Sequence, residues 1–217
     1  MKVVAVSDLH GYLPDIPSCD LLLIAGDICP AYDHSLTFQQ HWLDTEFRWW
    51  LKKRSAKTIV GIAGNHDFLF QEKPHWVPKL PWIYLQDSGI EIDGLKVWGS
   101  PWQLIFPAPN VWAFNLSEEE LYQKWCLIME DTDIVVLHGP PLGYGDIAPR
   151  MNKSGFENVG SPSLLRRLKS INPKLVVFGH IHEGFGCWQD GSIKLANVSF
   201  VDAQYKPRVN GWLEIEL

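Results

Sequence analysis

The sequence predicts an α/β fold in which short buried strands alternate with amphipathic helices. Five short apolar runs each end abruptly in a polar turn, and such continuous runs are typical of strands that are covered on both faces. Of the 217 residues, 46% are hydrophobic and 20% are charged, so the chain can bury a core without disulfides. No linker, repeat or low-complexity tract interrupts the sequence, and we therefore expect one domain over 1–217.

The expected strands follow one another in chain order. The five strongest cover 3–6, 21–25, 58–63, 134–137 and 175–178. Weaker segments predict strands near 81–85, 90–93, 95–99, 185–189, 192–196 and 212–216. The dipeptides Asp93-Gly94 and Asp190-Gly191 favour two-residue turns, so we expect a hairpin at each of them.

Three helices are expected between these strands. One covers 35–54, where the following apolar side chains share one face: Leu36, Trp42, Leu43, Phe47, Trp50 and Leu51. A second begins at Ser117, because Ser117 and Glu120 have the spacing of a capping box. A third begins at Ser161, which is followed by proline at the first helical position, Pro162.

Three remaining segments are expected to be loops. Segments 66–80 and 100–116 contain many prolines and aromatic residues without a period. The string at 143–148 matches the loose spacing of a dinucleotide-binding loop, but prolines on both sides exclude the helix that would have to receive a pyrophosphate.

Charge and cysteine content narrow the class of protein. The net charge of −6 argues against stable binding of nucleic acid or of an anionic membrane. The four cysteines show no metal-ligand spacing, so we expect free thiols. The first apolar run is too short for the core of a signal peptide, and no stretch is long enough to span a bilayer. These features predict a cytoplasmic protein, while the oligomeric state stays open.

The polar turns after the five strong strands concentrate potential metal ligands. Five of the eight histidines lie there, together with carboxylates and one amide. The full set is Asp8, His10, Asp27, Asn65, His66, Asp67, His138, His180 and His182. In open α/β sheets, functional residues lie beyond the carboxyl ends of the strands, so we expect these side chains to meet at one edge. Mixed nitrogen and oxygen ligands suit Mn, Fe or Zn.

Each turn taken alone also has a purely structural explanation. Asp8 can cap a turn, and Gly26-Asp27 is a common turn dipeptide. A lone histidine such as His138 is more often a hydrogen-bonded core residue than a ligand. Five such turns, each directly after a buried strand, are very unlikely to arise independently, so we favour a shared site.

The order of these turns resembles the calcineurin-like metallophosphoesterases. In chain order they give D-x-H, G-D, G-N-H-D, H and G-H-x-H, and the resemblance covers the chain from Val3 to about Phe200. Segments 99–103, 112–116 and 138–146 also resemble the metallophosphoesterase-domain-containing protein subfamily. That group is associated with the hydrolysis of cyclic nucleotides and other phosphodiesters.

The resemblance implies a four-layer α/β/β/α sandwich of two mixed β-sheets flanked by helices, with two metal ions between the motif loops. Carried over position by position, one metal would be held by Asp8, His10, Asp27 and His182. The other would be held by Asp27, Asn65, His138 and His180, so that Asp27 bridges the two. His66 would be the catalytic histidine and would bind no metal, and Asp67 would support it.

The chemistry of phosphodiester hydrolysis agrees with these roles. Two cations about 3.5–4 Å apart can clamp phosphate oxygens and lower the pKa of a bridging water. His66 can then protonate the leaving alkoxide as a general acid. We expect two divalent ions, with Mn²⁺ preferred over Fe or Zn because the ligand set contains several oxygen donors and no thiolate.

The expected partner is a small phosphate ester or nucleotide. Aromatic residues near the motifs could receive its ring, and we select Trp102 and Tyr144 from a set that also includes Phe68, Phe70, Trp112 and Phe185. Core packing is the alternative role for each of these side chains. The rival functions are a phosphomonoesterase or protein phosphatase of the same fold and a non-catalytic binding scaffold.

Overall fold

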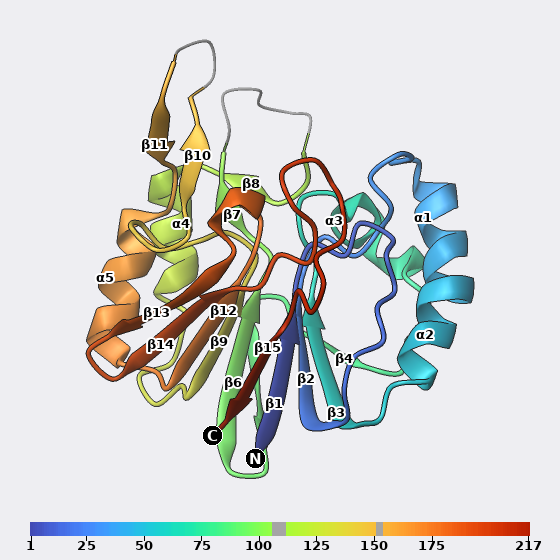
Figure 1. Cartoon of the computed structure of the whole chain (residues 1–217), viewed down its shortest axis with the longest axis horizontal. Coiled ribbons are helices and arrows are strands. Elements are labelled where there is room, and N and C mark those ends of the chain that lie inside the picture. Colours follow the sequence, from blue (N-terminus) through green and yellow to red (C-terminus); the bar gives the residue numbers. More distant parts are fainter. Residues whose placement is uncertain (106–111, 151–153) are drawn as a thin grey trace.

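Two mixed β-sheets pack face to face, and helices cover their outer surfaces (Figure 1). This computed structural model describes residues 1–105, 112–150 and 154–217. The arrangement confirms the four-layer α/β/β/α sandwich. Within the described ranges, no helix has both the length and the apolar character that crossing a bilayer requires.

The first sheet has the strand order β15-β1-β2-β3-β4. Its four neighbouring strands β1 to β4 run parallel, and β15 pairs antiparallel with β1 at the edge. The bounds are β1 Lys2–Val6, β2 Cys19–Ala25, β3 Ala56–Ile62, β4 Ile83–Tyr84 and β15 Leu213–Glu216. The strands predicted at the three strong runs of this sheet are therefore confirmed.

The second sheet has the order β13-β14-β12-β9-β6-β5. Its four central strands run parallel, and the two outer ones form the hairpins that Asp93-Gly94 and Asp190-Gly191 predict. The bounds are β5 Ser88–Ile92, β6 Leu95–Ser100, β9 Ile134–Leu137, β12 Leu175–Phe178, β13 Gly186–Asp190 and β14 Ile193–Asn197.

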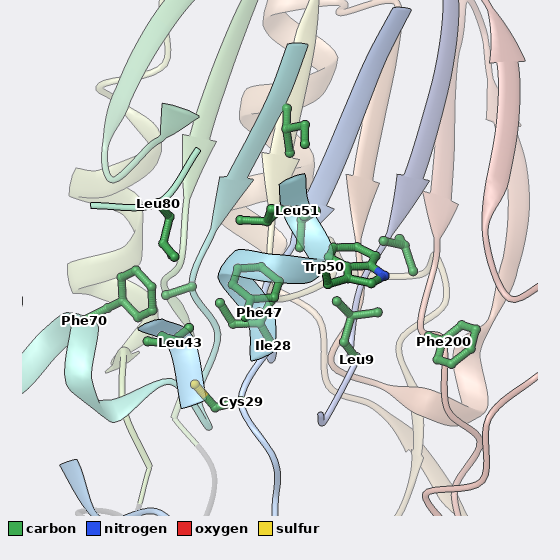
Figure 2. Packing of buried hydrophobic residues seen from close by; sticks show 14 of the residues in the cluster. Leu9, Ile28, Cys29, Leu43, Phe47, Trp50, Leu51, Phe70, Leu80 and Phe200 are labelled. Carbon is green, nitrogen blue, oxygen red and sulfur yellow. The ribbon is translucent and has the colours of Figure 1, made fainter. Parts of the chain in front are cut away.

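Helices on the outer face of the first sheet occupy the expected segment 35–54. They are α1 Leu36–Trp42, a π-helical stretch over Leu43–Phe47, and α2 Arg48–Lys52. Their apolar face, which includes Phe47, Trp50 and Leu51 in Figure 2, packs on the outward side chains of the sheet. Phe47 also stacks with Trp42 and Trp50. Fully burying one such side chain contributes about 1.5–3 kcal/mol, so this layer is a main source of stability.

The other outer layer consists of α4 (Glu118–Trp125) and α5 (Pro162–Ile171). Ser117 and Glu120 form the predicted capping box, and the Ser161 hydroxyl accepts a hydrogen bond from the backbone N–H of Leu164. Both helix starts are thus confirmed. The helices bury Leu121, Trp125, Leu164 and Leu168 against the second sheet.

Three segments differ from the expected loops. Segment 66–80 contains a one-turn helix, α3 Phe68–Glu72, and a 3₁₀ turn at Pro74–Trp76. Segment 100–116 contains β7 Gln103–Leu104 and β8 Asn115–Leu116, while 106–111 lies outside the described residues. No helix follows the string at 143–148, as expected, but β10 Ile147–Pro149 pairs there with β11 Phe156–Asn158. These elements are too short to produce a visible period.

The two sheets meet at the carboxyl ends of their parallel strands. The backbone N–H of Ser7 donates to the carbonyl of Val198, and that of Phe200 donates to the carbonyl of Ser7. Ser7 and Ser199 thereby form an isolated parallel bridge between the sheets. The turns that follow β1, β2, β3, β9 and β12 are thus brought to a common edge, as the sequence predicts.

Candidate metal centre

The loops after β1 and β2 continue side by side beyond the sheet. The backbone N–H of Asp8 donates to the Gly26 carbonyl at 3.0 Å, and that of His10 donates to the Asp27 carbonyl at 2.9 Å. These bonds fix Asp8, His10 and Asp27 in register next to one another. The sequence folds this way because the parallel pairing of β1 with β2 extends directly into the polar turns.

Four of the expected ligand residues have a left-handed backbone. The φ angles are 51° at Asp8, 44° at His10, 51° at Asp27 and 70° at His180. Residues other than glycine adopt this conformation at a cost of about 1–2 kcal/mol each. Such costs gather at functional sites, where the rest of the structure holds the residues in place.

Two glycines of the motifs allow the carboxylates to approach the backbone closely. A Cβ atom at Gly64 would collide with the carboxylate of Asp27, and one at Gly179 would collide with the carboxylate of Asp8. Any larger residue at these two positions would therefore push a carboxylate away from the centre.

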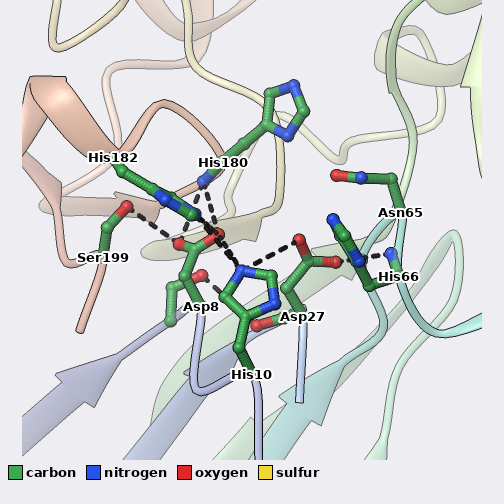
Figure 3. Close-up of polar contacts among 12 residues, drawn as sticks. Asp8, His10, Asp27, Asn65, His66, His180, His182 and Ser199 are labelled. Atoms are coloured by element: carbon green, nitrogen blue, oxygen red, sulfur yellow. Dashed lines mark hydrogen bonds and ion pairs between the residues drawn. The ribbon is translucent and has the colours of Figure 1, made fainter. Parts of the chain in front are cut away.

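The side chains converge into three groups among the described residues. In each group the potential ligand atoms lie within 4.8 Å of one another. The groups are Asp8, His10 and His182; His10, Asp27 and His66; and Asp8, Asp27 and His138. Figure 3 shows Asp8, His10, Asp27 and His182 directed toward one another. All of them are buried.

Backbone carbonyls fix the orientation of the His138 and His182 rings through their Nδ1 atoms. His138 Nδ1 lies 2.9 Å from the carbonyl oxygen of Ala25, and His182 Nδ1 lies 3.2 Å from that of Asp202. Because a carbonyl can only accept, each Nδ1 donates its proton. In the neutral rings the Nε2 lone pairs then point into the centre, which is the usual arrangement of a metal-binding histidine.

The atoms around His138 require a positive charge among them. Its Nε2 lies 2.9 Å from Asn65 Oδ1 and 3.4 Å from Asp27 Oδ2, so an unprotonated nitrogen would face two oxygens. Burial lowers the pKa of His138, but Asp27, Asp8 and the Ala25 carbonyl together raise this pKa to about 9. A divalent cation would satisfy all three atoms together. The donor set therefore fits a metal ion.

His10 and Asp8 support the same conclusion. His10 Nε2 lies 3.7 Å from Asp27 Oδ2 and 3.2 Å from His182 Nε2, and burial lowers the pKa of His10 to about 4. Its Nδ1 is buried and has no hydrogen-bond partner among the described residues. Burial opposes the ionisation of Asp8, yet His182 and His138 hold the pKa of Asp8 below its ordinary value. The buried carboxylates of Asp8 and Asp27 are thus anionic, and they lie next to a neutral His10.

Asp8 is further anchored by the second sheet. Its carboxylate accepts hydrogen bonds from the backbone N–H of His180, at 3.0 and 3.1 Å, and from the Ser199 hydroxyl at 2.8 Å. The ring of His180 points away from Asp8 in Figure 3, and its centroid lies 5.0 Å from that of His138. Of the residues with which His180 is expected to share a metal, His138 is thus its neighbour, and His180 itself belongs to none of the three converging groups.

His66 is fixed through its backbone. Its N–H donates to Asp27 Oδ1 at 2.8 Å, and its carbonyl accepts from the Gln39 side chain at 2.6 Å. The ring lies beside those of Trp112 and His10, with centroid distances of 4.4 and 4.7 Å. His66 therefore lies at the border between the carboxylates and the open pocket described below.

Asp67 points into the backbone of its surroundings. Its carboxylate accepts hydrogen bonds from the N–H groups of Ile28, Cys29 and Gly64, at 3.1, 2.9 and 2.8 Å. Burial and the charge of Asp27 raise the pKa of Asp67 to about 6. These contacts clamp the loop after β2 to the loop after β3.

A pocket of about 620 Å³ opens beside His10 and His66. Its lining is largely aromatic: Tyr12, Tyr32, Trp42, Trp112 and Tyr205. His34 and Glu46 also line it. Sequence reasoning missed Tyr205 and His34, because neither follows a strand or belongs to a motif. The positive φ of Tyr205, 58°, and its ring contacts with His10 and His182 are visible only in three dimensions.

Trp102 and Tyr144 do not line this pocket. The indole N–H of Trp102 donates to Asp87 at 2.9 Å, and the tryptophan borders a separate cavity of only about 10 Å³. Tyr144 packs against Trp188, and its hydrogen bond with Asp190 raises the pKa of Tyr144. Phe70 lies in the core, and Phe185 packs on the Arg208 guanidinium.

All four cysteines are free, as expected.

Comparison with known sequences assigns a family. The Calcineurin-like phosphoesterase family model matches residues 1–184. Human Metallophosphoesterase domain-containing protein 1 is 34% identical over 248 aligned residues, which cover 100% of this chain and 71% of that protein. A UPF0046 protein of Caenorhabditis elegans is 34% identical over 233 residues, covering 91% of this chain and 55% of that protein.

Solved structures share the fold. The phosphopantetheinyl hydrolase of Mycobacterium tuberculosis has a TM-score of 0.59 at 16% identity, covering 99% of this chain and 95% of that one. A putative 5′-nucleotidase of Staphylococcus aureus has a TM-score of 0.54 at 16% identity, covering 90% of this chain and 48% of that one. The family match, the relative that aligns with the whole of this chain and the shared fold agree, and the chain belongs to the calcineurin-like phosphoesterase family.

Proposed function

We propose that this protein is a phosphodiesterase that hydrolyses small phosphodiesters, such as cyclic nucleotides, with two divalent metal ions. The observation that carries the proposal is the convergence of buried carboxylates and imidazole lone pairs around Asp8 and Asp27. Such a set binds cations, and the resulting positive centre attracts an anionic ester as its ligand.

The proposed ligands divide into two overlapping shells. Asp8, His10, Asp27 and His182 hold one ion, and Asp27, Asn65, His138 and His180 hold the other. We propose Mn²⁺ for both, because the set contains several oxygen donors and no thiolate. Bound ions would supply charge stabilisation for the phosphate oxygens and activation of the attacking water.

The protein's own groups then position His66 and protonate the leaving oxygen. Asp27 accepts the backbone N–H of His66, which ties the histidine to the centre. We propose that the His66 ring donates a proton to the leaving oxygen, a role that accelerates such reactions by about 10²–10⁴-fold. Asp67 keeps the two loops together and takes no part in proton transfer.

The pocket beside His66 supports a diester with a ring-bearing leaving group. Its aromatic walls offer flat surfaces on which a base or phenyl ring can stack. Among the described residues that line it, none is lysine or arginine, and Glu46 contributes a negative charge. Such a pocket disfavours a second anionic group on the leaving side, as in a polyphosphate.

The proposal is tested on chelated protein to which Mn²⁺, Fe²⁺ or Zn²⁺ is added back. The substrates are 2′,3′- and 3′,5′-cyclic nucleotides together with a bis-ester and a mono-ester of nitrophenol. We expect Mn²⁺ to restore turnover of the bis-ester more than that of the mono-ester. Preference for the mono-ester would favour the phosphomonoesterase alternative, and metal binding without any turnover would favour a scaffold.

The role of His66 has its own test. We expect His66→Asn to retain both metals while kcat falls roughly 10²–10⁴-fold for a diester with a poor alkoxide leaving group. The fall should be visibly smaller for a nitrophenolate ester, which needs less protonation. An equal fall for both esters, or the loss of one metal, would show that His66 binds metal or shapes the site instead. The His66 ring lies close to His10 and Asp27, so the loss of one metal from the variant would identify His66 as a ligand.

A further inference from the structure

His34 lies at the rim of the pocket and contacts His66 directly. The two rings approach with His34 Nε2 at 2.9 Å from His66 Nδ1, and their centroids are 4.9 Å apart. His34 belongs to the loop between β2 and α1, in none of the motif turns. The calcineurin-like motif order gives it no role.

The loop holds the His34 ring in place through packing. The ring lies 5.0 Å from that of Phe68 and 5.7 Å from that of Trp112, centroid to centroid. The Asp33 carboxylate accepts the backbone N–H of Ser35 at 2.8 Å, which stabilises the turn into α1. The imidazole of His34 is therefore a fixed partner rather than a freely rotating surface group.

Three contacts together leave His66 little freedom. Asp27 and Gln39 hold its backbone on two sides, and His34 engages one nitrogen of the ring. The backbone contacts alone do not choose between the two ring orientations that exchange the nitrogens. A partner on Nδ1 makes that choice, and it leaves Nε2 as the nitrogen that can face substrate.

We propose that His34 is a positioning residue that fixes the ring orientation of His66, so that Nε2 of His66 faces the leaving group. The proposal rests on the proposed function, because it concerns the histidine that protonates the leaving group there. The hydrogen bond between the two rings acts as the orienting contact that a second residue commonly supplies to a catalytic histidine. His34 itself touches the pocket, and its role is exerted through His66.

The decisive variant is His34→Phe. A phenyl ring keeps the contacts with Phe68 and Trp112 but cannot bond to His66 Nδ1. A small misplacement of a reacting group costs up to about 10²-fold in rate, so we expect kcat to fall roughly 10- to 100-fold with KM little changed. The fall should be larger for the alkoxide diester than for the nitrophenolate diester. His34→Gln offers a hydrogen-bonding amide and should recover part of the loss.

A readout without turnover uses the metal-free protein. In the wild type, the ¹⁵N signals of the His66 ring should report a hydrogen bond at Nδ1, and His34→Phe should shift them. His75→Phe is the matched control, because His75 is an exposed histidine outside the site, and it should change neither readout. Metal content is measured on every variant.

The outcomes separate the two proposals. If His34→Phe leaves kcat for both esters and the His66 signals unchanged, His34 does not position His66, even though the enzyme remains a phosphodiesterase. If His34→Gln loses as much activity as His34→Phe, or if the loss is the same for both esters, the orienting hydrogen bond is also refuted. If the wild type hydrolyses no phosphate ester with any metal, the proposed function fails while the ¹⁵N readout still tests the contact.

Discussion

Two groups of aromatic residues differ in what their polar and stacking surfaces contact. We call Tyr12, Tyr32, Trp112 and Tyr205 the open side, because they line the 620 Å³ pocket beside His66. We call Trp102 and Tyr144 the closed side. There the indole N–H is bonded to Asp87, with the Lys124 ammonium over the ring, and the phenol is bonded to Asp190.

This difference shows that nearness to a motif in sequence is a weak guide to substrate contact. Trp102 and Tyr144 stand next to motif segments, and both are engaged by the protein's own charged groups. Trp112 also stands in such a segment, while Tyr205 comes from a loop outside every motif, and the rings of both border His66 at centroid distances of 4.4 and 6.4 Å. An aromatic residue receives a ligand when its surface borders an opening and is not already used inside the fold.

The largest expected effect comes from Asp27, which is assigned to both proposed ligand shells. Asp27→Asn should remove both metals, because Asp27 is the proposed bridge and its lost charge also increases repulsion between the cations. We expect kcat to fall by more than about 10³-fold, since two-metal catalysis is worth several kcal/mol. Metal stoichiometry and turnover are measured on the same purified sample.

The comparison variant for the bridge is His10→Ala. His10 is proposed for one shell only, so this protein should lose mainly one ion. Circular dichroism checks that both variants fold. Equal losses in the two variants, or a normal pair of metals in Asp27→Asn, would contradict the bridging assignment.

A smaller effect should appear on the open side. Tyr205→Asn removes the ring while keeping a residue that tolerates the left-handed backbone at this position, where φ is 58°. Loss of one stacking surface is worth about 1–3 kcal/mol, so KM for a nucleotide diester should rise roughly 10-fold. A methyl diester without a ring should be almost unaffected, and equal effects on both substrates would show that Tyr205 does not receive the ring.

On the closed side, stability should change instead of substrate binding. Trp102→Phe removes the hydrogen bond to Asp87, and a bond to a charged group contributes about 1.5–3 kcal/mol, less when partly exposed to water. We expect the free energy of unfolding to fall by about 1 kcal/mol, with KM unchanged. Chemical denaturation and steady-state kinetics together check this result, and a raised KM at unchanged stability would place Trp102 in the substrate site.

The sequence predicts the proposed ligand set better than it predicts the pocket, for a physical reason. Asp8, Asp27 and His138 directly follow buried apolar strands, so local patterns locate them at one sheet edge. The partners His34 and Tyr205 reach His66 and His10 only through loop packing, which no spacing encodes. Helix caps at Ser117 and Ser161 were predictable because their bonds span three residues.

The same limit applies to the fold. Strands of the two large sheets are readable because burial on both faces leaves a continuous apolar run. The helix α3 is a single turn held by the Gln39 side chain, which donates to the His66 carbonyl and accepts the N–H of Leu69. The hairpin β10–β11 is largely exposed and carries no apolar period. Both depend on contacts that the local sequence does not contain.

The smallest expected effect is that of Tyr144→Phe. The substitution removes only the phenol hydroxyl, whose partner Asp190 also forms an ion pair with Lys169 at 3.1 Å and therefore keeps a charged neighbour. The ring contact with Trp188 remains, because it does not involve the hydroxyl. We expect kcat and KM for every diester to stay within about twofold of wild type, since an exposed polar contact contributes little. Steady-state kinetics with a nucleotide diester and a methyl diester provide the measurement. A several-fold rise in KM for the nucleotide alone would mean that the hydroxyl reaches the substrate and that the closed side opens when substrate binds.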